Sequence, residues 1–227
     1  MKNFIKMLFF VLVVLSFIPH AHAIIVDLPT MADATVLSNQ PNVNAGDDAL
    51  FAQDETQHAY LKFDLTSIPD TAILNSVTLN VWNPSWTAND IVEIFHVFDD
   101  SWAENTITWN NRPALEGYPE YPLSSVSTAI MNNVSHSFDI FQFGVPDYTP
   151  DLVDNFVTFA FTTQGNGIFI FDNREAESLG TGSAGQTAAF LRTEYTAQQS
   201  SVVPEPTSMI LFSLGLLGIG FKRKPHK

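Results

Sequence analysis

Short apolar stretches separated by clusters of Asn, Asp, Gly, Pro and Ser run from residue 24 to residue 203. Apolar residues keep no sustained helical period, so the pattern predicts strands and not helices. In Tyr60–Asp64 and Val77–Val81, apolar and polar residues alternate, as expected when one face of a strand packs and the other is solvated. The predicted strands are Ala34–Leu37, Ala49–Ala52, Ala59–Leu65, Ser76–Trp82, Ile91–Phe98, Thr106–Trp109, Val134–Phe138, Phe156–Thr162, Gly167–Phe171 and Ala188–Tyr195. About ten short strands joined by turns predict an all-β fold, either a sandwich or a jelly roll.

The C-terminus carries a pattern of three parts: Pro204-Glu205-Pro206, an apolar run from Met209 to Phe221, and the basic cluster Lys222-Arg223-Lys224. As a helix, the 13-residue run would reach only about 20 Å, whereas the hydrocarbon core of a bilayer is about 30 Å thick. The run therefore predicts a transient membrane insertion and not a permanent anchor. Because Lys and Arg stay on the cytoplasmic side, the chain before Pro204 is expected outside.

The Pro-Glu-Pro element in front of a Leu/Gly-rich run and closing basic residues resembles the PEP-CTERM sorting signal. This resemblance implies an exported protein of a Gram-negative bacterium that makes extracellular polysaccharide. It also implies a partner, a membrane-embedded exosortase that cleaves the tail near Pro204, Glu205 and Pro206, and a membrane-inserted precursor. The expected destination is the cell surface or the extracellular matrix. The alternative, an ordinary retained C-terminal helix, is disfavoured by the short apolar span.

The N-terminus has the pattern of a secretory signal peptide. Lys2 and Lys6 precede the apolar run Met7–Ile18, and Ala21-His22-Ala23 fits the small-x-small rule for signal peptidase. We therefore expect residues 1–23 to be removed after Ala23. An uncleaved anchor helix is the alternative, which the cleavage motif and a proline at position 19 disfavour.

Between the two signals lie about 180 residues, enough for one domain with a buried core. We predict this domain at residues 24–197, a polar spacer at 198–203 and the sorting segment at 204–227. The chain has no Cys, so packing or a metal must replace disulfides. Residues 24–203 hold four basic and 23 acidic residues, a formal charge of −19. Nucleic acid is therefore excluded as a partner, whereas a cation such as Ca²⁺ is plausible beside the simpler reading of a solvated acidic surface.

The most distinctive internal segment is Trp102–Pro113, with the sequence WAENTITWNNRP. Two Trp residues seven positions apart cannot share one face of an uninterrupted strand, so a turn is predicted near Glu104-Asn105. Asn110 and Asn111 suit a turn in which amide side chains cap backbone groups. We predict that Trp102 and Trp109 belong to the core, with stacking on sugar rings as the alternative.

Trp102–Pro113, Asn42–Gly46, Tyr60–Leu65 and Phe171–Ala176 together resemble the DNRLRE-domain family over nearly the whole exported part. The resemblance implies a jelly-roll β-sandwich found on surface and matrix proteins of microbes. Some of those relatives are carbohydrate-binding modules attached to polysaccharide-degrading enzymes. The residues that carry this fold signature are Trp102, Glu104, Trp109, Asn110, Asn111, Arg174 and Glu175. Because Arg174 and Glu175 face opposite sides of a strand, Arg174 is expected to pair with another carboxylate, such as Glu104.

Three aromatic residues in polar loops are candidates for binding sugar. Trp86 lies among Asn, Pro, Ser and Thr, where it has little apolar surface to pack against, and it is the first choice as a stacking platform. Tyr118 and Tyr121, in a Pro-rich stretch, are second choices.

Oxygen-bearing side chains at Asn42, Asn44, Asp47 and Asp48, with a glycine between them, offer the ligands that Ca²⁺ prefers. An Asx-rich turn explains the same cluster, because the EF-hand spacing is absent. His58, His96 and His136 show no zinc spacing. The sequence assigns no catalytic residue.

These observations predict a non-catalytic exported protein of the surface or matrix that contacts polysaccharide. Two other functions stay open. One is a polysaccharide lyase or hydrolase, and the other is a purely structural matrix subunit without a ligand.

Overall fold

The computed structural model describes residues 22–45, 50–83, 90–127, 134–141, 147–174 and 188–198. The chain divides into two compact units, residues 1–197 and 198–227, and all the described elements belong to the first. They are β1 (Ala23–Leu37), β2 (Leu50–Ala52), β3 (Gln57–Asp64), β4 (Ile73–Asn83), β5 (Ile91–Val97), β6 (Ser124–Ser127), β7 (Val134–Asp139), α2 (Thr149–Asp154), β8 (Phe156–Thr163), β9 (Phe169–Phe171) and β10 (Phe190–Thr196). Within the described part of the chain, no helix has the length and apolar content needed to span a bilayer.

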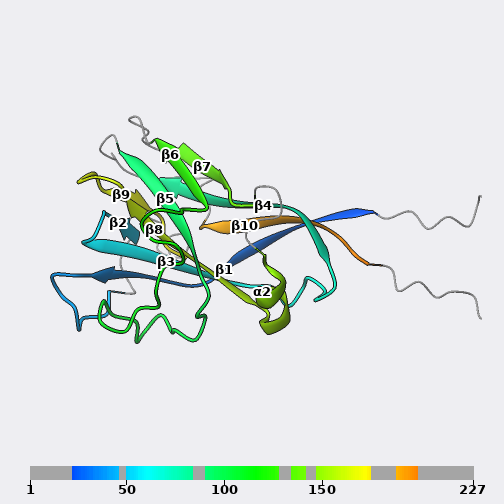
Figure 1. Ribbon diagram of the computed structural model, residues 1–227, viewed down its shortest axis with the longest axis horizontal. Coiled ribbons are helices and arrows are strands. Elements are labelled where there is room, and N and C mark those ends of the chain that lie inside the picture. Colours follow the sequence, from blue (N-terminus) through cyan, green and yellow to red (C-terminus); the bar gives the residue numbers. More distant parts are fainter. Residues whose placement is uncertain are drawn as a thin grey trace, which may run out of the picture. The chain divides into compact units, whose positions relative to one another are not determined.

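Eight strands form one antiparallel sheet in the order β6-β5-β8-β3-β1-β10-β4-β7, and β2 pairs with β9 (Figure 1). Strand β1 belongs to two layers, because its first half pairs with β10 and its second half with β3, with a register shift between Thr30 and Ala32. The sheet therefore folds over at β1, and its two edge strands, β6 and β7, approach each other. The prediction of an all-β fold is confirmed, and the facing layers fit a β-sandwich of jelly-roll type.

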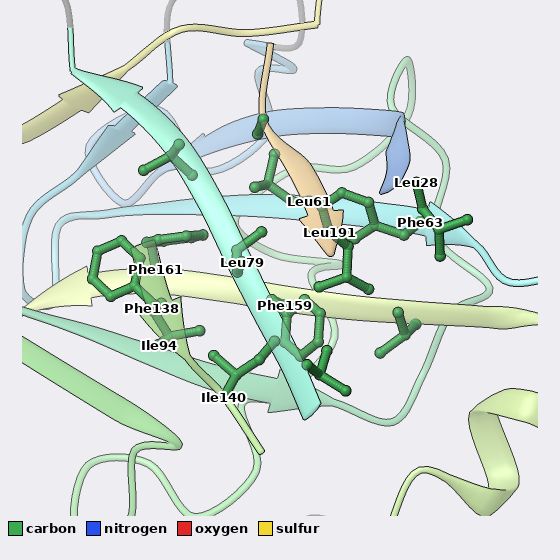
Figure 2. Packing of buried hydrophobic residues seen from close by; sticks show 14 of the residues in the cluster. Leu28, Leu61, Phe63, Leu79, Ile94, Phe138, Ile140, Phe159, Phe161 and Leu191 are labelled. Carbon is green, nitrogen blue, oxygen red and sulfur yellow. The ribbon is translucent and has the colours of Figure 1, made fainter. Parts of the chain in front are cut away.

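The core lies between the two layers, as Figure 2 shows. One layer supplies side chains from β3, β5 and β8, and the other supplies them from β1, β4, β7 and β10. Members labelled in Figure 2 include Leu28, Leu61, Phe63, Leu79, Ile94, Phe138, Phe159, Phe161 and Leu191. Burial of such a side chain contributes about 1.5–3 kcal/mol, so this apolar interior is the main source of stability.

The expected solvated face of β3 is absent. Tyr60 is fully buried and Lys62 is 8% exposed, and Asn80 in β4 is also only 8% exposed. On β3 the reason is a second buried cluster on the outer face of the sheet, whose members are Ala34, Val36, Tyr60, Val97, Trp102, Ile107 and Ala160. Residues 98–123, which we call the covering loop, supply Trp102 and Ile107 to this cluster. The prediction of one packed and one wet face for Tyr60–Asp64 is therefore wrong.

Three local predictions also change. Residues 106–109 form turns and not a strand, because the carbonyl of Ala103 accepts hydrogen bonds from the backbone N–H groups of Thr106 (3.0 Å) and Ile107 (2.9 Å). This confirms the predicted turn near Glu104. Strand β1 begins at residue 23 and not at residue 34, since its first half has β10 as a partner. Strand β6 and helix α2 were not expected from the sequence.

Strand β10 lies inside the sheet, between β1 and β4. Its charged residue Arg192 faces Asp27 of β1 in the register, and two parallel hydrogen bonds of 2.7 Å join the guanidinium to the carboxylate. The pair lies on the exposed side of the strands, which explains how a charged residue fits an internal strand. In Figure 1, β1 and β10 run side by side at the end of the domain where the described chain begins and ends.

Candidate functional site

The covering loop is closed at its Trp102 end. The indole Nε1–H of Trp102 donates to the Thr158 hydroxyl at 3.0 Å, and the ring packs edge-on against Tyr60. Lys62 reaches from β3 to donate through Nζ to the carbonyls of Asp100 (2.6 Å) and Trp102 (2.5 Å), and its ammonium lies 4.6 Å from the centre of the Trp102 ring. Trp102 is 8% exposed, as predicted for a core residue. These contacts hold the Trp102 end of the loop closed against the sheet, and they leave no face of the Trp102 ring for a ligand.

Glu104 fastens the covering loop to the sheet. Its carboxylate lies 3.0 Å from Nη2 of Arg174 and accepts a hydrogen bond of 3.2 Å from the backbone N–H of Asp33. The backbone N–H of Arg174 donates to the buried carboxylate of Asp33 at 2.6 Å. Nη1 of Arg174 donates to the backbone carbonyl of Met31 at 2.8 Å. The predicted pairing of Arg174 with Glu104 is thus present, and it joins three distant segments of the chain. Glu175 lies outside the described residues.

The predicted cation ligands have structural partners where they are described. The amide nitrogen of Asn44 donates to the carbonyls of Glu104 (2.6 Å) and Ile107 (2.8 Å). The side-chain oxygen of Asn42 accepts from the amide of Asn110 at 2.9 Å. These contacts bind the turn after β1 to the covering loop.

Asp47 and Asp48 lie outside the described residues, so the Ca²⁺ site stays a prediction. Within the described ranges, no three His, Asp or Glu residues gather in a way that could hold a metal ion.

The other end of the covering loop is open, and we call the side chains of His58, Trp109, Arg112 and Tyr118 the ring cluster. The His58 ring lies 5.0 Å from Trp109 and 5.8 Å from Tyr118 between ring centres. The guanidinium carbon of Arg112 lies 3.6 Å from the centre of the Trp109 ring, and its Nη1 donates to the Trp109 carbonyl. Trp109, Arg112 and Tyr118 are half-buried. The cluster therefore presents preformed, partly accessible aromatic and polar surface.

Asn111 holds the turn that positions Trp109. Its side-chain oxygen accepts from the backbone N–H of Thr108 at 2.6 Å, and its amide nitrogen donates to the carbonyl of Thr106 at 3.0 Å. Asn110 acts differently, because its backbone N–H and its amide both donate to the turn after β1. Asn111 therefore caps backbone groups of its turn, as predicted, whereas the Asn110 amide donates to the side chain of Asn42.

His58 is neutral at pH 7. Burial, and next the charge of Arg112, lower the pKa of His58 from 6.5 to about 4. Its Nε2 lies 3.0 Å from the carbonyl of Asp54, which can only accept, so Nε2 carries the proton. Nδ1 is then an acceptor, and it is buried without a hydrogen-bond partner among the described residues.

Burial and charge both act on the Tyr118 hydroxyl. Burial raises the pKa of Tyr118, and the negative charges of Asp54, Glu55 and Glu93 raise it further, whereas Arg112 lowers it. Glu93 is only 4% exposed, and Gln164 donates to its carboxylate at 2.6 Å. Tyr118 therefore keeps its hydroxyl proton at pH 7, and the Glu93 carboxylate is held by Gln164.

The sequence located this surface only in part. Tyr118 belongs to the ring cluster, while Trp86 lies outside the described residues. Tyr121 is 77% exposed and lies on the same turn, where its backbone N–H donates to Gly117 at 2.9 Å. Gly117 has a φ of +71°, and a Cβ there would lie 2.9 Å from Cβ of Tyr121, so this turn requires glycine.

His58 and Arg112 were missed as site residues. The available signal was the spacing of His58, Tyr60 and Lys62, which places all three on one face of a strand.

A hollow of about 280 Å³ lies at the same end of β3, on the side of Gln57. The side chains that line it are mixed in character: Thr35, Leu37, Asn39, Phe51, Gln57 and Ile168. Because Gln57 and His58 are consecutive in a strand, the hollow and the ring cluster lie on opposite faces of the sheet.

A buried histidine ties the covering loop to helix α2. His96 has no exposed side-chain surface, and its Nε2 and Nδ1 lie 2.9 Å from Asp151 and 3.1 Å from Glu116. Burial lowers the pKa of His96, but the two carboxylates outweigh burial and hold it above 6.5. This contact joins β5, α2 and the covering loop, and its role is structural.

Comparison with known proteins gives matches at both parts of the chain. The model of carbohydrate-binding module family 96 matches residues 24–179, which include the whole covering loop and the ring cluster. The model of the PEP-CTERM protein-sorting motif matches residues 202–224. A gellan lyase from a Bacillus species is 31% identical over 90 residues, which are 38% of this chain and 4% of the lyase. The chain thus spans a small fraction of the length of that enzyme.

Proposed function

Because the chain belongs to carbohydrate-binding module family 96 and carries a PEP-CTERM protein-sorting motif, we propose that it is a non-catalytic, exported polysaccharide-binding protein of the cell surface or extracellular matrix. The single observation that carries the binding role is the ring cluster, which is half-exposed where the rest of the outer face of β3 is closed. The residues proposed to contact the ligand are Trp109, Tyr118 and Tyr121, with Trp86 as a further candidate.

The chemistry of the ring cluster suits a sugar. The flat apolar face of an aromatic ring matches the C–H face of a pyranose, and the polar edge of Tyr or Trp can form hydrogen bonds at the same time. Arg112 supplies N–H donors for hydroxyl groups, and the Tyr118 hydroxyl can both donate and accept. Because His58, Arg112 and the turn hold the rings in place, little conformational entropy is lost on binding.

Retention by polysaccharide tests the binding role. We expect the mature protein to be retarded in gels that contain polysaccharide from its own host, with saturation at rising polymer concentration. Tyr118→Ala and Trp86→Ala should reduce the retardation. Phe98→Ala is the matched control, because Phe98 is an aromatic residue of the same loop that is 60% exposed and packs on His96 instead. Equal retardation of all three variants and the unchanged protein would contradict the proposed site.

The proposed sorting route predicts processing at both ends. Mass spectrometry of the protein from its native host should show a chain that begins at Ile24 and lacks Met209–Lys227. Exosortase is the proposed enzyme at the C-terminal site, near Pro204–Pro206. An intact tail on the exported protein would overturn this route and favour a retained anchor.

A catalytic role is the second candidate, and the similarity to a gellan lyase over 90 residues is the observation that favours it. Incubation of the mature protein with the polymers that it retains, followed by assay of new reducing ends and unsaturated products, separates the two roles. We expect no turnover. If the protein neither binds saturably nor releases products, the remaining function is that of a structural matrix subunit.

A further inference from the structure

Glu116 of the covering loop is attached twice to His96 of β5. Its backbone N–H donates to the His96 carbonyl at 2.9 Å, and its carboxylate lies 3.1 Å from Nδ1 of the His96 ring. The first contact joins two backbone groups and does not titrate, whereas the second depends on a proton of the imidazole. The covering loop is therefore held to β5 partly by a bond that can be broken by a change of pH.

The same segment of the loop carries Tyr118 to the ring cluster. Tyr118 follows Glu116 by two positions, and its ring packs edge-on against Phe95, the neighbour of His96 in β5. Because consecutive residues of a strand point to opposite faces, Phe95 and His96 lie on opposite sides of the sheet. The His96 ring is on the side of Phe159, which belongs to the core between the layers. Glu116 therefore fixes the chain two positions before a ring of the proposed binding surface.

Both nitrogens of the His96 ring face a carboxylate. Nε2 lies 2.9 Å from Asp151 and Nδ1 lies 3.1 Å from Glu116, and the ring has no exposed surface. An imidazolium donates from both nitrogens, whereas a neutral imidazole keeps one N–H and turns a lone pair toward the other carboxylate. Asp151 is 3% exposed, and its Oδ2 is buried without a hydrogen-bond partner among the described residues. The remaining proton therefore belongs on Nε2, and the contact with Glu116, whose side chain is 43% exposed, is the one that is lost.

The charges that act on His96 come from these two carboxylates. The side chains that contact the ring lie at α2, in the covering loop and in β8, and in the described part of the chain they are Tyr148, Asp151, Phe98, Glu116 and Phe159. Burial raises the pKa of Tyr148 well above its usual value, so Tyr148 stays neutral. The next charges outward, Asp100 and Asp154, interact with Asp151. Burial lowers the pKa of His96, but Asp151 and Glu116 outweigh burial, so the imidazole loses its proton above pH 6.5.

We propose that His96 is a positioning residue for the ring cluster, and that loss of its proton releases Glu116 and weakens the binding of polysaccharide. This inference rests on the proposed function, since it concerns the same ligand at the same surface. The ring cluster itself does not titrate near neutral pH, because the pKa of His58 is about 4 and burial raises that of Tyr118. Asp100 titrates at a lower pH, since burial raises its pKa to about 6, and it lies at the closed end of the loop.

Two readouts on the mature protein test the inference. NMR signals of the histidine rings give the pH at which His96 is half protonated, and the ring signals of Tyr118 should shift with the same midpoint. Gels that contain polysaccharide from the host are then run about one pH unit below and about one above that midpoint. We expect the dissociation constant to rise about threefold or more across it, because the released loop presents Tyr118 in a less ordered state.

Glu116→Gln separates His96 from every other group that titrates in this range. The amide of the new side chain can accept from the imidazolium and donate to the neutral ring, so the contact survives in both states. Retardation of this variant should not change across the midpoint. Glu120→Gln is the matched control, because it removes the same charge from an exposed carboxylate of the same loop and should keep the pH dependence of the unchanged protein.

Each result decides between the proposals. If Glu116→Gln keeps the pH dependence of Glu120→Gln, or if the Tyr118 signals do not follow the titration of His96, then His96 does not position the ring cluster and the inference is overturned. Retardation of the unchanged protein that stays constant across the midpoint would overturn it too, and would leave the proposed function standing. No retardation at any pH would overturn the proposed function and this inference with it.

Discussion

Trp102 and Trp109 lie in one loop, yet their surroundings differ in almost every respect. Trp102 is 8% exposed, its N–H is satisfied by Thr158, and the Lys62 ammonium lies 4.6 Å from its ring centre. Trp109 is half-buried, packs against His58 and carries the Arg112 guanidinium on its ring. The residue type therefore does not decide whether a Trp belongs to the core or to a surface. The decisive feature is how completely the covering loop closes over β3.

Replacement of the buried ring should have the largest effect. Trp102→Ala removes a ring from a closed cluster and leaves the Thr158 hydroxyl without its donor, so we expect a loss of about 3–5 kcal/mol in the free energy of unfolding. Urea denaturation followed by circular dichroism measures it. Trp102→Phe is the control, and it should lose less because a ring remains. A loss below about 1 kcal/mol for Trp102→Ala would mean that the two ends of the loop are alike.

Acid should lower the free energy of unfolding through His58, at the open end of the covering loop. Because its pKa falls from 6.5 to about 4 on folding, its stabilising effect is complete above pH 6.5 and is lost as the pH falls toward 4. At about 1.36 kcal/mol for each unit of pKa, the loss reaches about 3 kcal/mol. His58→Gln can still donate to Asp54 but cannot titrate, so its unfolding free energy should fall less between pH 7 and pH 4. Parallel curves for the two proteins would contradict this assignment.

Replacement of Lys62 should destabilise the closed end of the covering loop by less than replacement of Trp102 does. Lys62→Met keeps the length of the apolar chain but leaves the carbonyls of Asp100 and Trp102 without their donor, which should cost about 2 kcal/mol. Arg192→Met is the matched control, because it removes the same charge from an exposed ion pair and should change stability less. Chemical denaturation at pH 7 compares them. An equal effect of both substitutions would show that Lys62 acts through net charge alone.

The smallest effect on stability is expected at the half-buried ring of Trp109. Trp109→Ala should cost about 1 kcal/mol, well below the cost at Trp102, while the retardation by polysaccharide is lost. Thermal unfolding and affinity electrophoresis on the same preparation measure both quantities. If Trp109→Ala destabilised the protein as much as Trp102→Ala and left retardation unchanged, the ring cluster would be core and not a site.

The sequence alone predicted those features of the fold that depend on neighbouring residues, and it also predicted one ion pair. Alternating residues predicted β3 and β4, and the expectation that Arg174 and Glu175 face opposite sides predicted a partner such as Glu104 for Arg174. Lys62 shows the limit. In a strand pattern it looks like a solvated residue, and only the distant covering loop, which is 36 or more positions away, makes it a buried donor. Helix α2, with six residues, is too short to show a period.

The candidate site was harder to predict than the fold. Tyr118 could be chosen for its polar, Pro-rich surroundings, but His58 and Arg112 become site residues only through contacts across 50 or more positions. Likewise the internal place of β10 depends on pairing with β1, more than 150 positions earlier. Such long-range pairing leaves no trace in local periodicity.

The position of β10 sets the order of events during export. It is the last strand in the described part of the chain and lies between β1 and β4, so the first half of β1 and one edge of β4 lack a partner until residue 196 has crossed the membrane. The predicted signal-peptidase bond after Ala23 lies in the strand that β10 then covers, opposite Thr196 and Tyr195. We therefore expect the proposed cleavage after Ala23 to come before β10 pairs with β1. The polypeptide would cross the membrane unfinished, with two open strand edges that could pair with another chain.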